Sequence, residues 1–336
     1  GVVVLSMLYG KDSFDDTINI CNMCGWDTDC NVGNVGCITA VRLGLSAIDY
    51  RKWRAPINDF LVFSSVVGSL NLQDIPQGAS YIAKLAYLVA GQEAPEGWKE
   101  ILEQDGNLCH FEYPGSTHAM RVRAEIEGPL EAWVENSEEY AHTGKRSLKM
   151  CARRVAAADT VSLYKKTHCR PADFHDSRYD PCFSPTVYPG QTVEADVFVA
   201  PGDAELLAQM YVYDGNHQQV LAGARELCRE GQWVHLRYEI PHLDGACLEE
   251  VGVKFTRPAP CSGDREVRVF LDDLKVSGSP DYTVDFSLER EEPWPCPHRE
   301  ISQFTVLKGL FHLEGDELHL SCADFAEMYT GGDSWT

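Results

Sequence analysis

Long apolar runs and positive charge are both scarce in this 336-residue sequence. No apolar run approaches the roughly 18 to 20 residues that a membrane-spanning helix needs, so we expect a soluble protein with no membrane partner. The 29 Lys and Arg stand against 51 Asp and Glu, which gives a formal net charge of -22. Such a charge repels phosphate backbones and anionic lipids, which argues against a nucleic-acid partner and against a membrane-surface role.

The start of this sequence also does not have the pattern of an export signal. The opening segment GVVVLSML is apolar, but no basic residue precedes it and no cleavage-like site of small residues follows it. We therefore expect a cytoplasmic protein, with an extracellular location as the alternative. The first residue is not Met, and the last segment, SCADFAEMYTGGDSWT, is typical of the middle of a sheet. These ends predict a fragment of a longer chain that is cut at both ends.

Repeats of solenoid period and low-complexity tracts are absent as well. The composition is 44% hydrophobic and 24% charged with 27 Gly and 17 Pro, which is typical of globular proteins and not of collagen-like, coiled-coil or disordered chains. At roughly 150 residues per domain, the length predicts two domains or a little more.

The thirteen cysteines are odd in number, so at least one is unpaired. Without an export signal, their scatter favours reduced and mostly buried thiols in a cytosolic protein. Cys21 and Cys24 form a C-x-x-C, which is compatible with redox chemistry or zinc binding. That interpretation is disfavoured because no second C-x-x-C follows at zinc-finger spacing and because the pair falls on a predicted helix.

Residues 1–95 carry the signals of all-α packing. Ser13 is placed to cap a helix over 14–24, in which Phe14, Ile18 and Cys21 share one face. Acidic residues in its first turn favour the helix dipole.

Two further helices are predicted in this region. One covers residues 31–45 and is rich in Gly and Ala, and such small residues let a neighbouring helix approach closely. The other covers residues 75–90, begins after Asp74 with Pro76 in its first turn, and ends at Gly91.

From about residue 105 the pattern changes to short alternating strands. Segments such as TVEADVFV, AQMYVYD and VRVFLDDLKV are rich in Val, Tyr and Phe and are separated by turn residues at intervals typical of a sandwich. The segment 91–106, with Pro, Gly and acidic residues, is the predicted linker. After Pro280 the strand pattern stops, and a third unit is predicted to begin near residue 283.

Asp27 and Asp29 stand one residue apart in GWDTDCN, between two predicted helices. In such a loop both carboxylates can turn toward one point, beside the free N–H groups at the N-terminus of the next helix. Two convergent carboxylates repel each other unless a cation lies between them, and oxygen ligands suit Mg²⁺ or Ca²⁺. The alternative is a pair of solvated acids that cap the helix, because D-x-D is a common pattern.

The run YGKDSFDDTINICNMCGWDTDCNVGNVGCITAVRLGL, residues 9–45, resembles the C-terminal signature of the ADP-ribosylglycohydrolase family, which includes the dinitrogenase-reductase-activating glycohydrolases. In that pattern a helix ends in Gly, an Asp-x-Asp loop follows, and a Gly- and Ala-rich helix packs behind it. The resemblance implies an all-α fold and a two-metal Mg²⁺ centre. It also implies hydrolysis of a glycosidic bond at the ribose anomeric carbon of an ADP-ribosyl or other ribosyl substrate.

Position by position, the resemblance assigns Asp27 and Asp29 as metal ligands. Cys30 stands where the family usually has a hydroxyl residue as a further ligand, and its soft sulfur suits Mg²⁺ poorly, so we expect water to replace it. Asn31 is expected to hydrogen-bond a ligand carboxylate.

The rest of the family's centre, a hydroxyl-Asp-Asp motif and the catalytic acid, belongs to a more N-terminal part of the family's fold. Asp15, Asp16 and Thr17 look similar but lie inside a predicted helix and in the wrong order, so we interpret these acids as helix-dipole partners. We therefore expect half a metal centre, and an inactive chain from an active parent hydrolase.

The β region resembles a jelly-roll carbohydrate-binding module through FEYPGSTHAMRV, YAHTGKRSLKM and the closing VFLDDLKVSG. The resemblance implies a glycan partner. Because such modules often hold structural Ca²⁺, Asp272 and Asp273 are candidate calcium ligands, with a polar strand end beside a turn as the alternative.

Aromatic side chains bind sugars by stacking, although about half of those on an alternating strand point inward. The candidates are Trp133, Tyr164, Tyr179, Tyr188, Tyr211, Tyr213 and Trp233, of which Trp233 is predicted to pack. His168, Cys169 and His175 form a weaker metal candidate in a stretch where a solvated loop is favoured.

The sequence thus predicts a multidomain protein, α then β. Residues 1–95 form part of an all-α ADP-ribosylglycohydrolase-like helical bundle, 105–282 an antiparallel β-sandwich of jelly-roll type, and 283–336 the truncated start of a concanavalin-like sandwich. The predicted function is that of a Mg²⁺-dependent glycosidic-bond hydrolase with a glycan-binding accessory module. The alternatives are a non-catalytic carbohydrate-binding or adaptor protein, and sandwiches that only space or stabilise the enzyme.

Overall fold

The computed structural model describes residues 1–62, 71–104, 108–125, 131–170, 173, 185–203, 205–258, 265–289, 291–292, 299–301, 304–308, 310–321 and 327–329. Its contacts divide the chain into two compact units, Gly1–Asp59 and Phe60–Thr336. The domain limits at residues 95 and 282 were drawn from sequence modules and stay a prediction. Within the described part, no helix has both the length and the apolar character to cross a membrane.

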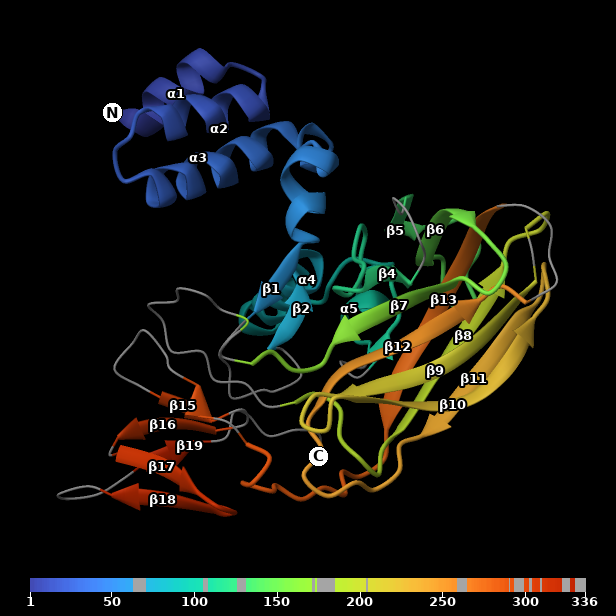
Figure 1. Ribbon diagram of the computed structural model, residues 1–336. Coiled ribbons are helices and arrows are strands. Elements are labelled where there is room, and N and C mark those ends of the chain that lie inside the picture. Colours follow the sequence, from blue (N-terminus) through green and yellow to red (C-terminus); the bar gives the residue numbers. More distant parts are fainter. Residues whose placement is uncertain are drawn as a thin grey trace. The chain divides into compact units, whose positions relative to one another are not determined.

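The helical unit contains three α-helices followed by three short helical turns. The α-helices are α1 (Val2–Gly10), α2 (Phe14–Met23) and α3 (Thr28–Leu43), which pack on one another (Figure 1). The turns are η1 (Leu45–Ala47), η2 (Tyr50–Arg54) and η3 (Ala55–Ile57).

Capping and close approach explain how these helices form and pack. As predicted, Ser13 caps α2, because its hydroxyl accepts a 3.1 Å hydrogen bond from the backbone N–H of Asp16. Gly10 lets α1 approach α2, since a Cβ at this position would lie 2.1 Å from the hydroxyl oxygen of Thr17. The small core between the helices is built on Ile18, Cys21 and Val35, with Phe14 partly buried against it.

Two short strands lie inside the region that was predicted to be all-helical. β1 (Phe60–Val62) and β2 (Leu72–Asp74) pair antiparallel. The prediction of purely helical packing over residues 1–95 is therefore wrong at these positions. The aromatic and β-branched residues of Phe60–Val62 fit a pleated, half-buried strand better than a helix.

The helix predicted over 75–90 is confirmed as α4 (Ile75–Ala90), which is followed by the single turn α5 (Lys99–Leu102). Asp74 caps α4 by accepting a 2.9 Å hydrogen bond from the backbone N–H of Gln77. Gly91 ends it in the left-handed conformation, with φ at 62°.

Asp74 also ties α4 to the sandwich. Its buried carboxylate accepts hydrogen bonds from the hydroxyl of Ser116, at 2.9 and 3.1 Å, and from the backbone N–H of Thr117 at 2.9 Å. Burial raises the pKa of Asp74, and the hydrogen bonds from these groups act against that rise.

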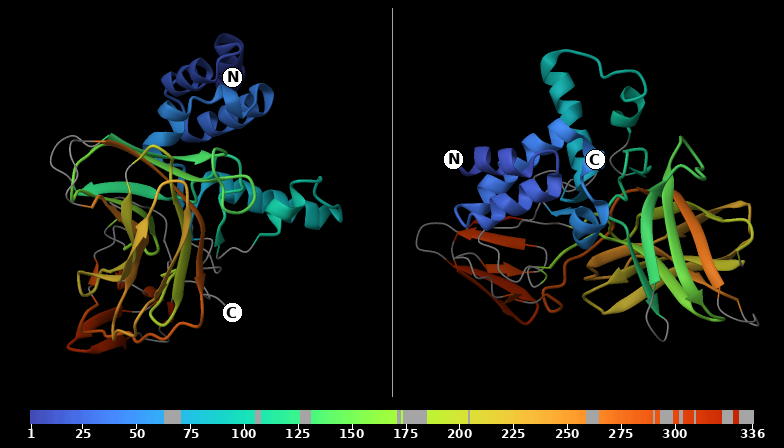
Figure 2. Two further views of the ribbon diagram at one scale, coloured as in Figure 1. Left: turned by 90° about the vertical axis from the view of Figure 1, so that its right-hand side faces the viewer. Right: turned by 90° about the horizontal axis from the view of Figure 1, so that it is seen from above.

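Residues 108–277 form the predicted antiparallel β-sandwich. Its strands are β3 (Leu108–Cys109), β4 (Arg121–Glu125), β5 (Glu131–Ser137), β6 (Ser147–Val155), β7 (Thr160–Lys166), β8 (Thr192–Val199), β9 (Leu206–Asp214), β10 (Gln219–Cys228), β11 (Trp233–Glu239), β12 (Leu248–Thr256) and β13 (Arg265–Ser277). One sheet has the order β10-β9-β12-β7-β4. The other has the order β11-β8-β13-β6-β5, with β3 paired to β13. Figure 2 shows these sheets as the two layers of the sandwich.

Alternation of side chains decides what each sheet buries. In β7 and β12, for example, Leu163, Val251 and Val253 point into the core, whereas Tyr164 and Lys254 belong to the outer face. Among the residues that the structure describes, the core contains 31 buried apolar residues drawn from both sheets. The predicted fold class, helices followed by an antiparallel sandwich, is confirmed.

The C-terminal residues form two further small sheets. The strands β14 (Glu291–Glu292), β15 (Arg299–Ile301), β16 (Phe304–Lys308) and β19 (Glu327–Tyr329) make one antiparallel sheet, and β17 (Leu310–Glu314) and β18 (Glu317–Ser321) make a hairpin. The concanavalin-like identity of this region stays a prediction.

The nine described cysteines are all free, and six of them are buried, as predicted. Cys21 of the C-x-x-C lies in the helical core, whereas Cys24 is exposed and its thiol donates to the carbonyl of Ile20. The two thiols therefore face different surroundings, which does not favour a redox pair or a zinc site.

Candidate functional site

The loop between α2 and α3 holds the residues predicted to bind metal. Gly25 (φ 63°) and Asp27 (φ 44°) both adopt left-handed conformations, so the chain reverses sharply before α3 begins at Thr28. Asp27 occupies the N-cap position of α3, but its side chain makes no capping hydrogen bond. The carboxylate is thus not used as a helix cap, which was the alternative interpretation of the D-x-D pattern.

The structure brings Asp27, Asp29 and Cys30 together. One ligand atom from each, a carboxylate oxygen or the thiol sulfur, lies within 4.8 Å of the others, and all three residues are exposed. The negative charges of Asp27 and then Asp29 raise the pKa of the Cys30 thiol. The cluster therefore concentrates negative charge on an accessible surface, where a cation would be favoured.

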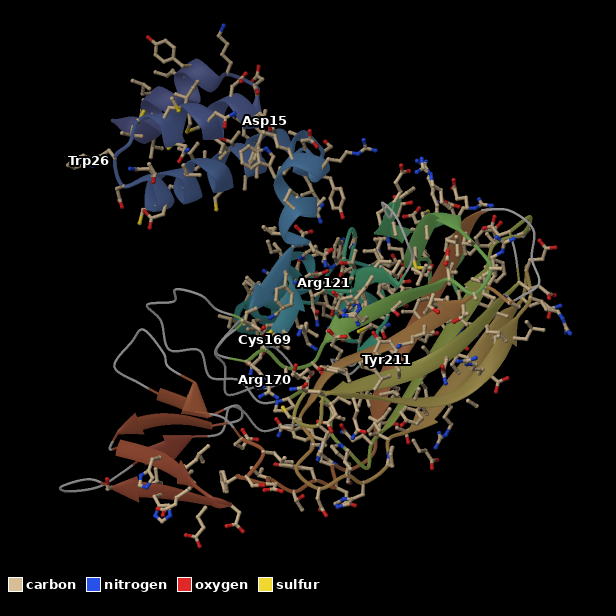
Figure 3. All side chains as sticks on the ribbon, viewed as in Figure 1. Asp15, Trp26, Arg121, Cys169, Arg170 and Tyr211 are labelled. Carbon is tan, nitrogen blue, oxygen red and sulfur yellow. The ribbon has the colours of Figure 1, made fainter. Side chains whose placement is uncertain are left out.

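Asn31, predicted to bond a ligand carboxylate, orders the loop through its side chain and backbone. Its side-chain amide donates to the carbonyl of Trp26 at 2.8 Å, and its backbone N–H donates to the carbonyl of Asp27 at 3.0 Å. Trp26 is 73% exposed and points outward from the loop (Figure 3). Asn31 thus binds the carbonyls of two adjacent residues, Trp26 and Asp27, and fixes the chain where α3 begins.

Asp15 has a structural role in the helical unit. Its carboxylate accepts hydrogen bonds from Lys52 Nζ at 2.6 Å and from the indole N–H of Trp53 at 2.5 Å, and these bonds lower the pKa of Asp15. These two hydrogen bonds hold η2 against the start of α2, so the Asp15 carboxylate stabilises the packing of the helical unit.

A second cluster lies on the outer face of the sheet β10-β9-β12-β7-β4. The Arg123 guanidinium donates to both carboxylate oxygens of Glu250, at 2.8 and 3.3 Å, and to the hydroxyl of Tyr211 at 3.3 Å. The same guanidinium lies 4.4 Å from the ring centroid of Tyr164, a cation–π distance. Four strands thus contribute to one polar and aromatic surface, on which Figure 3 labels Tyr211.

Gly252 makes this cluster possible. It is paired with Tyr164 on one side and with Tyr211 on the other. A Cβ at Gly252 would lie 2.9 Å from the Tyr211 ring and 2.2 Å from the carbonyl oxygen of Leu163. Only a residue without a side chain leaves room for the two tyrosines to share this face.

The predicted sugar-stacking aromatics differ in exposure. Tyr188 and Tyr211 are buried, at 5% and 0% exposure, and so offer no open ring face. Trp233 packs against the buried Phe198 and Phe270, as predicted. The remaining described candidates keep partial exposure: Trp133, Tyr164 and Tyr213. Tyr179 lies outside the described residues.

Asp272 and Asp273, the predicted calcium ligands, hold the loop that follows β5. The buried Asp272 carboxylate accepts backbone hydrogen bonds from His142 (2.8 Å), Thr143 (3.2 Å) and Asp273 (2.9 Å). Burial, together with the neighbouring Asp273, raises the pKa of Asp272 to about 7. Asp273 accepts from the Thr143 hydroxyl and contacts His142 Nδ1, both at 2.8 Å, and it forms one group of potential ligands with His142 and Asp196.

The stretch that begins at His168 is not a solvated loop at its start. His168 and Cys169 are 1% and 4% exposed, which corrects the prediction for these two residues. Burial raises the pKa of the Cys169 thiol to about 12, so a metal-binding thiolate is disfavoured there. His175 lies outside the described residues.

Sequence reasoning missed Arg123, Glu250 and Asp196. Alternation along each strand could have placed Arg123 and Glu250 on outer faces, but their contact depends on the strand order, because they are 127 positions apart in the sequence. No local pattern contains that information.

Comparison with known proteins finds that residues 1–102 match the family model described as ADP-ribosylglycohydrolase, the family that residues 9–45 resemble. No curated protein matches the chain.

Among solved structures, the matches include carbohydrate-binding modules. One, from the β-sandwich superfamily, is 15% identical to this chain. The match covers 51% of this chain and 62% of the other, with a TM-score of 0.38. A xylan-binding CBM22-1 domain of Paenibacillus barcinonensis Xyn10C is 19% identical to this chain. The match covers 49% of this chain and 88% of that domain, with a TM-score of 0.30. The C-terminal family 22 module of Clostridium thermocellum Xyn10B is 21% identical, with 52% and 96% coverage and a TM-score of 0.32.

Proposed function

We propose that this chain is part of a Mg²⁺-dependent hydrolase that cleaves an N- or O-glycosidic bond to ribose, in the manner of the family matched by residues 1–102. The observation that carries the proposal is the convergence of Asp27 and Asp29 at the start of α3. A cytoplasmic location is part of the same proposal.

Two of the three potential ligands in the loop, Asp27 and Asp29, suit Mg²⁺. Carboxylate oxygens are the ligands that Mg²⁺ prefers, and Asp27 is free of a capping bond that would compete with the metal. The Cys30 sulfur suits this ion poorly, so a water is expected in its place. Mg²⁺ commonly keeps several waters, and the exposure of all three residues allows them.

The chain's own residues have separate tasks in this proposal. Asp27 and Asp29 hold the cation, and Asn31 keeps the loop in the shape that points them together. Bound Mg²⁺ would supply Lewis-acid stabilisation of the charge that shifts as the glycosidic bond breaks. The family's remaining ligands and catalytic acid belong to a more N-terminal part of its fold, so we propose that the 336-residue chain is inactive.

Metal binding tests the proposal directly. Mn²⁺, followed by electron paramagnetic resonance and displaced by Mg²⁺, should bind the full chain. Asp27→Asn or Asp29→Asn should weaken that binding at least tenfold. Asp16→Asn, in the exposed first turn of α2, is the matched control and should bind as the unaltered chain does. Equal binding by all four chains would remove the metal site, and Mg²⁺-dependent turnover of ADP-ribosylated substrates would contradict the proposed inactivity.

Cys30→Ser sharpens the test. A hydroxyl is a harder ligand than a thiol and is what the family usually places at this position, so the substitution should tighten Mg²⁺ binding. No gain in affinity would mean that the position does not face the metal.

A glycan-binding role of the sandwich is the second candidate, favoured by the Arg123–Glu250–Tyr164 surface. Arginine, carboxylate and a partly exposed ring on one sheet face are groups that can hydrogen-bond and stack on a sugar. The full chain on a glycan array should bind, and Tyr164→Ala should lose the signal. Trp133→Ala, on the other sheet, should keep it. A blank array would favour the view that the sandwich only spaces or stabilises the enzyme.

A structural Ca²⁺ at Asp273 stays a proposal of its own. Asp272 already receives three backbone hydrogen bonds, so Asp273 is the better ligand of the two. Calcium should raise the melting temperature of the full chain and should have no such effect on Asp273→Asn.

A further inference from the structure

The hairpin β17–β18 places two histidines and two glutamates on one of its faces. The register pairs His312 with His319 and Glu314 with Glu317. Because side chains alternate along a strand, these four residues share one side of the hairpin. Among the residues whose side chains the structure describes, the other side carries the apolar Leu313, Leu318 and Leu320.

The backbone fixes this arrangement. Gly315 and Asp316 form the two-residue connection, and Gly315 adopts φ 64°, the left-handed conformation that tight hairpins require at their turn. Directly opposite residues in an antiparallel pair have Cβ atoms about 4.5 to 5.5 Å apart. The rings of His312 and His319 accordingly stack with centroids 5.0 Å apart and an interplanar angle of 14°.

The potential ligand atoms already have the spacing that a zinc ion needs. In a tetrahedral site with bonds of about 2.0 Å, two ligand atoms lie roughly 3.3 Å apart. The Nε2 atoms of His312 and His319 lie 3.6 and 3.9 Å from Glu314 Oε2, and His319 Nε2 lies 3.2 Å from Glu317 Oε2. The ligand atoms of His312, Glu314 and His319 all lie within 4.8 Å of one another.

The charges on this face also favour a cation. Glu314 and Glu317 are direct cross-strand partners, and like charges in that position destabilise a hairpin. Imidazole and carboxylate together are ligands that zinc accepts, whereas Mg²⁺ and Ca²⁺ prefer oxygen alone. A two-stranded sheet is marginal by itself, so a metal that bridges both strands would stabilise it.

We propose that His312, His319 and Glu314 bind Zn²⁺ on the surface of the β17–β18 hairpin, with Glu317 or water as the fourth ligand. The ion joins the two strands across the face and neutralises the opposed carboxylates. This site is separate from the Asp27–Asp29 loop and does not depend on hydrolase or glycan-binding activity.

A site-resolved footprint on the full chain tests the proposal without any substitution. Diethyl pyrocarbonate modifies accessible imidazoles, and mass spectrometry locates the product. After removal of metals with a chelator, Zn²⁺ should lower the modification of His312 and His319 at least fivefold and should leave His242 unchanged. His242 is a suitable internal reference because its side chain is similarly exposed, at 43% against 60% and 42%.

Calorimetric titration with Zn²⁺ gives the second measurement. His312→Ala and His319→Ala should each lose one equivalent of bound Zn²⁺, or bind it at least tenfold more weakly, whereas His242→Ala should bind as the unaltered chain does. Unchanged modification of His312 and His319 in the presence of Zn²⁺ would overturn the proposal. Equal zinc binding by the unaltered chain and both histidine variants would overturn it as well.

Discussion

The helical unit and the sandwich differ in how much apolar surface each one buries. Three buried apolar residues, Ile18, Cys21 and Val35, form the core of the helical unit, against 31 in the described part of the sandwich. Large apolar side chains that remain exposed on the helical unit include Val4, Leu5, Leu8, Tyr9, Met23, Trp26, Ile38 and Val41. Because burial of apolar surface is the main driving force of folding, the sandwich should be the more stable part of the chain.

The difference originates in the two sequence patterns. α1 is apolar on all sides, so packing on α2 and α3 leaves part of it uncovered. The sandwich strands alternate, so each sheet contributes one face to the common core, and Phe198 and Phe270 form a second, smaller apolar cluster on an outer face. The proposed metal loop therefore lies on a lightly packed helical unit, whereas the proposed glycan surface lies on a heavily packed sandwich.

A core truncation in the sandwich should have the largest effect. Phe255→Ala removes a ring that is 2% exposed and should lower the free energy of unfolding of the sandwich by about 3 to 5 kcal/mol. Val41→Ala, at a position of α3 that is 88% exposed, should change the helical unit by less than about 0.5 kcal/mol. Hydrogen exchange of the full chain in urea, read from peptides of each unit, measures both. A loss at Val41 as large as that at Phe255 would contradict the difference in packing between the two units, because it would show that this face of α3 is buried.

The two units should also differ in how acidification changes their stability. Burial lowers the pKa of His110 to about 4 and that of His118 well below its ordinary value of 6.5, whereas residues 1–59 contain no histidine. Between pH 6.5 and 4 the unfolded chain therefore binds protons at these two histidines that the folded sandwich does not, so the two histidines lower its stability as the pH falls. Asp272, whose pKa burial raises to about 7, acts in the opposite direction. For His110 alone the loss reaches about 3 kcal/mol near pH 4.

Urea unfolding at pH 7 and pH 4.5, followed by a hydrogen-exchange pulse at one common pH, measures this loss for each unit. His110→Asn keeps an acceptor for the backbone N–H of Glu112, which bonds His110 Nδ1 at 2.9 Å, but does not titrate. The variant should lose less stability than the unaltered chain when the pH falls from 7 to 4.5. An equal pH dependence in the unaltered chain and the variant would mean that other groups control it.

Local signals in the sequence predicted the ends of elements well. Ser13, Asp74 and Gly91 mark helix boundaries through hydrogen bonds within a few residues, and the structure has the helices where these residues place them. The strands of the sandwich followed from alternation in the same way. β1 was missed because a short apolar run does not distinguish a strand from a helix.

Contacts between distant segments could not be predicted. The D-x-D spacing indicated a loop with two carboxylates, but only the left-handed conformation of Asp27 shows that its carboxylate stays out of the helix cap. The pairing of His312 with His319 required the hairpin register. The contact of Arg123 with Glu250 required the order of the three strands β4, β7 and β12. These features depend on tertiary structure, in which no short pattern is sufficient.

The helix caps Asp74 and Ser13 are closely matched positions, at which substitutions should have the smallest effects on stability. Asp74 is buried and serves the N–H of Gln77 together with two groups outside its helix, whereas Ser13 caps α2 with one exposed hydrogen bond. Asp74→Ala should cost about 2 kcal/mol, because it leaves buried donors unpaired, and Ser13→Ala about 1 kcal/mol. Hydrogen exchange of α4 and of α2 in the full chain measures these two losses of stability. Asp74→Asn, which keeps one acceptor oxygen, should recover part of the loss. If Asp74→Ala cost no more than Ser13→Ala, the carboxylate would not tie α4 to the sandwich, and α4 would behave as part of the lightly packed region.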